Sequence, residues 1–105
     1  MSDRISALQK MLQEGEKDPF LHYALALEYD KAGQRPEALR ALEELFKNNP
    51  DYLPLYYQWA VWLLKEGVEI KAREIISLGM EVSRLQSQTK ILSELQLLLD
   101  SCDGV

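Results

Sequence analysis

Few residues in this chain are suited to catalysis or metal binding. Its 105 residues include one histidine, one cysteine and five glycines, with no glycine-rich loop of the kind that binds phosphate. Cys102 lies in a polar tail beside Asp100, Asp103 and Gly104, and it has no second cysteine with which to form a disulfide or a metal cluster. Catalysis requires several titratable groups held together in a pocket. The sequence therefore predicts a protein that is not an enzyme and has no cofactor or metal, with Cys102 as an inert thiol.

Positive charge and long apolar runs are also scarce. Lysine and arginine number 12 against 17 aspartates and glutamates, a formal net charge of −5. Nucleic-acid binding needs a basic stripe that neutralises phosphates, and an anionic membrane would repel the same negative field. No apolar run approaches the roughly 18 residues of a membrane span, and no signal-peptide core follows Met1-Ser2-Asp3-Arg4. We expect a cytoplasmic protein that binds neither nucleic acid nor membrane.

Helix start and stop signals, by contrast, are abundant. A composition of 47% apolar and 28% charged residues is typical of a small globular domain. Asp18 offers a helix N-cap, and Pro19 suits the first helical position, where a missing N–H costs nothing. Gly33 can adopt the left-handed conformation that ends a helix, and Pro36 then begins a second helix. That helix ends before Pro50, which disfavours helical geometry in the preceding residue. The signals predict a helical hairpin in an all-α protein.

The same signals recur 34 residues later, which indicates an internal repeat. Six identical pairs carry this register: Leu21 and Leu55, Tyr23 and Tyr57, Ala26 and Ala60, Lys31 and Lys65, Gly33 and Gly67, and Ala38 and Ala72. We predict two hairpins whose equivalent helices stack, with the four alanines at points where helices come into close contact.

Two further helices flank the hairpins. Apolar residues at helical spacing predict both of them, and in the last helix Leu97 lies off the apolar face. We expect a single domain over residues 1–105, with an N-terminal helix at 3–15, a first repeat at 19–50, a second repeat at 53–85 and a closing helix at 88–100.

The hairpins resemble the tetratricopeptide repeat (TPR), whose pattern is W-x₂-L-G-x₂-Y, then A-x₃-F, then P. In the first hairpin the successive slots hold His22, Leu25, Ala26, Tyr29, Ala38, Leu42 and Pro50. In the second they hold Tyr56, Trp59, Ala60, Leu63, Ala72, Ile76 and Arg84. Because Arg84 replaces the closing proline, the second helix of this repeat can run on toward Leu85 to Thr89. The chain is similar to short stand-alone bacterial TPR proteins, which implies a superhelix of two repeats.

The repeat pattern also assigns structural roles to His22, Trp59 and Trp62, which could otherwise suggest catalysis or nucleic-acid binding. His22 stands in the tryptophan slot with no spaced nucleophile or metal partner, so a packed histidine is favoured over a catalytic base. Trp59 and Trp62 could stack on nucleic-acid bases, but the negative charge argues against this. Both are expected in the core, Trp59 within its hairpin and Trp62 against a neighbouring helix.

The resemblance implies a protein-binding function. In TPR proteins the first helix of each pair lines a concave face that commonly holds a peptide. The slots that resemble groove-lining ones are Tyr23, Leu27, Asp30 and Lys31 in the first hairpin, and Tyr57, Val61, Leu64 and Lys65 in the second. Spacings of four and three residues put each set on one helical face, and we expect the two sets to form one surface. Five of the eight residues are apolar, so something should cover them.

Three coverings of this surface remain open: an unknown protein or peptide partner, a second copy of the chain, or the chain's own closing helix. A partner is preferred, which makes the chain an adaptor or scaffold. The alternative is a self-assembling structural module, a homodimer whose groove is buried by the second copy or by the closing helix. Some TPR domains clamp chaperone carboxyl tails with lysine and asparagine where Tyr23 and Leu27 stand here. Lys31 and Lys65 alone do not rebuild that clamp, so chaperone-tail binding is not expected, although an acidic segment could still be held.

Overall fold

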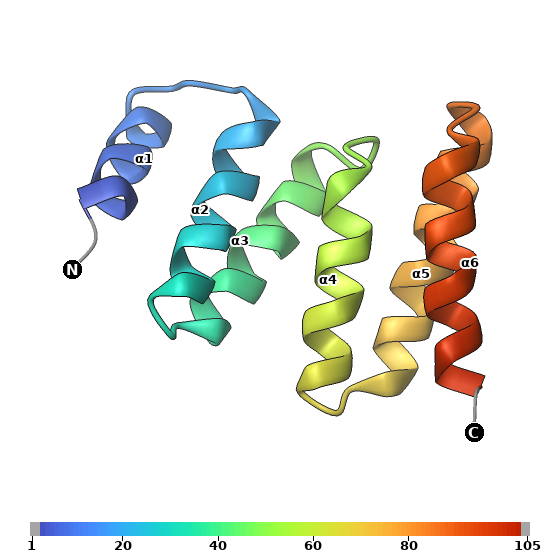
Figure 1. The fold of residues 1–105 in the computed structure, drawn as a ribbon. Coiled ribbons are helices and arrows are strands. Elements are labelled where there is room, and N and C mark those ends of the chain that lie inside the picture. Colours follow the sequence, from blue (N-terminus) through green and yellow to red (C-terminus); the bar gives the residue numbers. More distant parts are fainter. Residues whose placement is uncertain (1–2, 104–105) are drawn as a thin grey trace. The chain divides into compact units, whose positions relative to one another are not determined.

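The computed structural model describes residues 3–103, all of whose regular structure is α-helical. The six helices are α1 (Asp3–Gln13), α2 (Pro19–Lys31), α3 (Arg35–Asn48), α4 (Pro54–Lys65), α5 (Glu69–Leu85) and α6 (Thr89–Asp103), drawn in Figure 1. The predicted all-α class is confirmed. The chain divides into two compact units, Met1–Tyr52 with α1 to α3 and Leu53–Val105 with α4 to α6. Met1, Ser2, Gly104 and Val105, which belong to the N-terminal and tail segments discussed above, lie outside the described residues.

The helical hairpin of the first unit begins and ends where its signals predict. The Asp18 side chain caps α2 by accepting a hydrogen bond of 3.0 Å from the Phe20 backbone N–H, and Pro19 is the first helical residue. At the other end Gly33 has a φ of +77°, in the left-handed region where a side chain would be strained. Its N–H donates to the Asp30 carbonyl. This turn reverses the chain direction and leads into α3.

Small residues let α2 and α3 pack closely in this unit. Ala26 on α2 and Ala38 on α3 are fully buried, as are Leu42 and Leu45. Helix α1 lies beside α2, where it buries Ile5. The core of the first unit therefore contains the alanines that the repeat register placed at close contacts.

The second unit repeats this hairpin with heavier side chains. Ala60 on α4 and Ala72 on α5 are fully buried, and Trp59 and Trp62 are 3% and 2% exposed. The Lys71 ammonium lies 5.5 Å from the ring centre of Trp59, a cation–π contact between α5 and α4. Both tryptophans thus belong to the core, as the sequence predicts.

Helix α5 continues for 17 residues to Leu85, because no proline ends it where Pro50 ends the first repeat. The junction with α6 is a tight turn centred on Ser87, whose φ is +56°. Its N–H donates to the Arg84 carbonyl at 3.1 Å, and the Gln88 N–H donates to the Ser83 carbonyl at 2.8 Å. The turn therefore has the hydrogen-bond pattern of the Gly33 turn with serine in the strained position.

Gly79 marks the point where the three helices of the second unit meet. A Cβ atom at Gly79 would lie 2.7 Å from the Tyr56 Cβ and 3.0 Å from the Leu95 Cδ1. Ser83, fully buried, donates its hydroxyl to the Gly79 carbonyl at 2.7 Å, so it leaves no unsatisfied donor in the core. Only a residue without a side chain allows α4 and α6 to approach α5 this closely, and α6 accordingly lies along α5 (Figure 1).

Candidate protein-binding surfaces

The four predicted binding residues of α2, here called the α2 face, are Tyr23, Leu27, Asp30 and Lys31. The first three are half-buried and Lys31 is exposed. The Tyr23 ring packs against Tyr52 at a centroid distance of 5.7 Å and an angle of 58°. Burial raises the pKa of Tyr23, and burial together with the nearby Tyr23 and Asp18 raises the pKa of Tyr52. Tyr23 is therefore partly engaged inside its own unit.

The charged residues of the α2 face also have partners within the first unit. The Arg35 guanidinium donates to the Asp30 carboxylate at 2.8 Å, which ties the end of α2 to the start of α3. The Lys31 ammonium lies 3.8 Å from the Glu28 carboxylate, which also pairs with Arg4 of α1 at 3.2 Å. A ligand of the α2 face would compete with these ion pairs, so Tyr23 and Leu27 are the residues best placed to contact one.

The four predicted residues of α4, the α4 face, are Tyr57, Val61, Leu64 and Lys65. Tyr57 is 43% exposed. Val61 and Leu64 are half-buried and Lys65 is exposed. Within residues 3–103 the Lys65 ammonium forms no ion pair. This face is therefore more open than the α2 face.

A hollow of about 260 Å³ lies between α4 and α6, and we call it the Tyr57 pocket. It is lined by Tyr57, Glu94, Leu97, Leu98 and Ser101. Helix α6 lies beside Tyr57 and leaves the ring 43% exposed. None of the binding residues predicted from sequence lies on α6. The available signal was Leu97, which lies off the apolar face of its helix and is 69% exposed.

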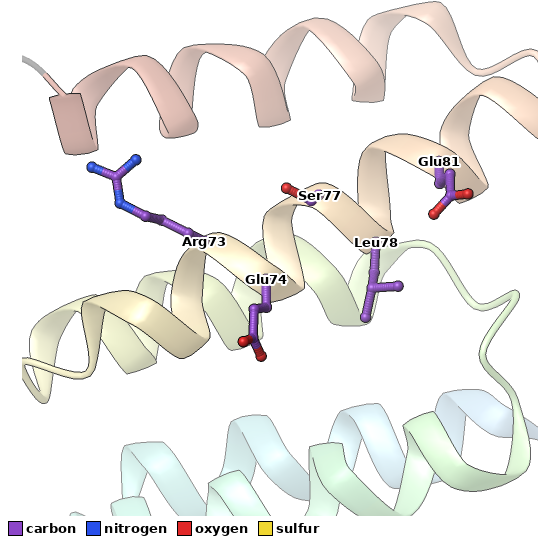
Figure 2. Close-up of a pocket in the computed structure, with 5 residues that line it drawn as sticks. All are labelled: Arg73, Glu74, Ser77, Leu78 and Glu81. Carbon is purple, nitrogen blue, oxygen red and sulfur yellow. The ribbon is translucent and has the colours of Figure 1, made fainter.

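A second hollow, of about 520 Å³, lies along α5 (Figure 2). Its lining residues all belong to one helix: Arg73, Glu74, Ser77, Leu78 and Glu81. Figure 2 shows Arg73 directed toward α6, whereas Glu74 and Leu78 point to the opposite side of α5. The Arg73 guanidinium pairs with Asp103 at 2.7 Å and Glu69 at 3.3 Å, and these hydrogen bonds raise its pKa. Arg73 therefore fastens α6 to α5 and is not free to bind a ligand.

The remaining candidates for chemistry are isolated from one another. His22 is half-buried and lines a hollow of about 330 Å³ together with Glu16, Lys17, Asn48 and Asn49. Cys102 is half-buried with its Sγ 3.5 Å from the Leu98 carbonyl oxygen. Across residues 3–103 no three histidine, cysteine or acidic side chains gather closely enough to hold a metal ion. None of the six helices is long and apolar enough to cross a membrane.

Solved structures of known proteins resemble this chain closely. No family model matches it, and no curated protein does. A tetratricopeptide repeat domain protein from Salinibacter ruber, solved by NMR, is 35% identical over 85% of this chain and 90% of its own, with a TM-score of 0.81. The crystal structure of that protein gives a TM-score of 0.78 at the same identity, covering 85% of this chain and 99% of its own.

A more distant neighbour supports the fold alone. A protein from Bordetella parapertussis is 23% identical over 96% of this chain and 88% of its own, with a TM-score of 0.79. The TPR-like fold predicted from the hairpin slots is thus confirmed, and its neighbours come from bacteria. Because its 35% identity extends over nearly the whole of the Salinibacter domain, this chain belongs to the tetratricopeptide-repeat family.

Proposed function

We propose that the chain is a non-catalytic module that binds a segment of a partner protein through the α4 face, with the α2 face as a second contact surface. TPR folds generally serve protein interactions, because stacked helices present extended surfaces. The observation that carries the proposal is Tyr57, a large side chain 43% exposed at the edge of a pocket. A cytoplasmic adaptor or scaffold function remains the expectation from sequence.

Tyrosine has the properties of an interface anchor. It buries a large area while fixing few rotatable bonds, and its hydroxyl can still find a polar partner. Val61 lies one turn after Tyr57 on the same side of α4 and is half-buried, which extends the apolar area along the helix. On α2 the equivalent pair is Tyr23 and Leu27, of which Tyr23 already packs against Tyr52. The proposal therefore gives Tyr57 the larger contribution to binding.

A self-assembling homodimer is the second candidate. Leu85 and Leu97 are 84% and 69% exposed in the second unit, which is apolar surface that a second copy could cover. Two copies would each carry a net charge of −5, and this opposes their association at low salt. A partner of opposite charge meets no such repulsion.

Light scattering on gel-filtered protein and a quantitative pull-down from the native host test these candidates together. We expect a monomer, and a specific partner that Tyr57→Ala loses at least tenfold while the melting temperature changes by less than about 6 °C. The matched control is Ile70→Ala, which removes an apolar side chain that is 79% exposed on α5. Equal retention of the partner by Tyr57→Ala and Ile70→Ala would refute the proposal. A dimer that Tyr57→Ala dissociates would support the self-assembling alternative.

A further inference from the structure

The Tyr57 pocket combines apolar walls with groups that accept hydrogen bonds. Tyr57 and the two leucines of α6 supply the apolar lining. Its volume of about 260 Å³ is below the roughly 300–1,000 Å³ of pockets that take whole small molecules. The pocket is therefore suited to one side chain of a larger partner.

Besides the Tyr57 hydroxyl, which can both donate and accept, the polar groups of this pocket are acceptors. The Ser101 hydroxyl already donates to the Leu98 carbonyl at 2.6 Å, so only its lone pairs remain for a ligand. Glu94 is exposed, and it forms no ion pair with any of residues 3–103. Lys90 stands one turn before Glu94 and is the nearest cation in the sequence of α6, yet it does not pair with it. The last carbonyls of α6 add the negative end of a helix dipole near Ser101.

The acidic residues around Glu94 differ from it in having partners. Asp103 pairs with Arg73 at 2.7 Å, and Asp100 accepts a hydrogen bond of 2.9 Å from the Gln96 amide. Glu94 thus remains as the free carboxylate of this helix, beside an open apolar pocket. A carboxylate in this position favours a cationic group on whatever occupies the pocket, since a charge-assisted hydrogen bond is stronger than a neutral one.

We propose that the Tyr57 pocket recognises a basic and apolar segment of a partner protein: an aliphatic or aromatic side chain enters the pocket, and a neighbouring lysine or arginine pairs with Glu94. This inference rests on the function proposed above and names the chemistry of the partner. An acidic segment is disfavoured because it would bring a second negative charge to Glu94 in a chain whose net charge is already −5.

The test is selection of a random dodecapeptide library, displayed on phage, against the immobilised wild-type protein. We expect the enriched peptides to carry lysine or arginine within two positions of a large apolar residue. A synthetic peptide of the enriched sequence should bind at least tenfold more weakly to Tyr57→Ala and about two- to fivefold more weakly to Glu94→Gln. Glu94→Lys should weaken it further, because it adds repulsion to the lost pair.

The matched control for charge is Glu81→Gln, an exposed residue of α5 that loses the same charge away from the Tyr57 pocket. It should bind the peptide as the wild type does. Higher salt should weaken binding to the wild type more than binding to Glu94→Gln, because only the former has the ion pair to screen.

The other outcomes separate the inference from the function on which it rests. Enrichment of acidic peptides that Tyr57→Ala fails to bind overturns the inference and retains the α4 face. Enriched peptides that bind Tyr57→Ala normally but are lost by Tyr23→Ala overturn the inference and move the binding surface to α2. A dimer dissociated by Tyr57→Ala assigns the pocket to a second copy and overturns the inference. A library with no enriched peptide overturns both proposals.

Discussion

Tyr23 and Tyr57 occupy the same repeat position, one in each unit, and their surroundings differ. Tyr23 packs against Tyr52 from the segment after α3, whereas Tyr57 stands at the edge of an open pocket beside α6. Lys31 has an acidic neighbour at 3.8 Å, while its equivalent Lys65 has no ion-pair partner within residues 3–103. The repeat register thus determines which residues share a helical face. The segments that flank each hairpin determine which of them remain exposed.

The largest effects are expected at Ala26 and Ala60, which occupy the same repeat position in the cores of the two units. Ala26 and Ala60 are both fully buried, so Ala26→Leu and Ala60→Leu should each overpack a core and lower the free energy of unfolding by about 1–3 kcal/mol. Urea denaturation measures both. The control is Ala32→Leu, an exposed residue just after α2, which should unfold with nearly unchanged stability.

At Gly79, by contrast, the cores of the two units differ. Its counterpart in the first repeat is Leu45, which is fully buried, so the same position holds a large side chain in one unit and none in the other. Gly79→Ala should lower the free energy of unfolding by about 1–2 kcal/mol, although alanine is the better helix former, because the new Cβ meets Tyr56 at 2.7 Å. A stabilised Gly79→Ala protein would contradict the close contact of the three helices.

Much of this fold follows from the sequence. Asp18, Pro19 and Gly33 mark helix ends through local chemistry, and the alanine slots identify core contacts because small residues recur in register. Gly79 could not be predicted in the same way, since the 34-residue shift pairs it with a leucine. A glycine is needed here because of α6, which packs against α5 and lies outside the two predicted hairpins. The Tyr57 pocket was not predicted for the same reason, because Glu94 and Leu97 belong to that closing helix.

The two tyrosines should separate stability from binding. Tyr23→Ala removes the contact with Tyr52 and should lower the free energy of unfolding by about 1–2 kcal/mol, since aromatic pairs contribute about 0.5–1.5 kcal/mol beyond their buried area. Tyr57→Ala should cost less than about 1 kcal/mol, because its ring is already 43% exposed. Thermal and urea unfolding of both variants measure the difference. Equal losses would mean that Tyr57 is as structural as Tyr23.

The smallest expected effect concerns the turns. Ser87 takes the left-handed backbone conformation that glycine takes in the turns of the two hairpins. Ser87 has a φ of +56°, whereas Gly33 and Gly67 take +77° and +78° without steric cost. Ser87→Gly should relieve left-handed strain of roughly 1–2 kcal/mol, offset in part by the greater freedom that glycine gives the unfolded chain. We therefore expect a gain of about 0.5 kcal/mol in the free energy of unfolding, measured by urea denaturation. Ser77→Gly is the matched control: the same change in the middle of α5, at an exposed residue, should instead lose about 0.5 kcal/mol, because glycine is a poor helix former. If Ser87→Gly destabilised the protein as much as Ser77→Gly, the left-handed turn between α5 and α6 would be wrong, and with it the placement of α6 beside Tyr57.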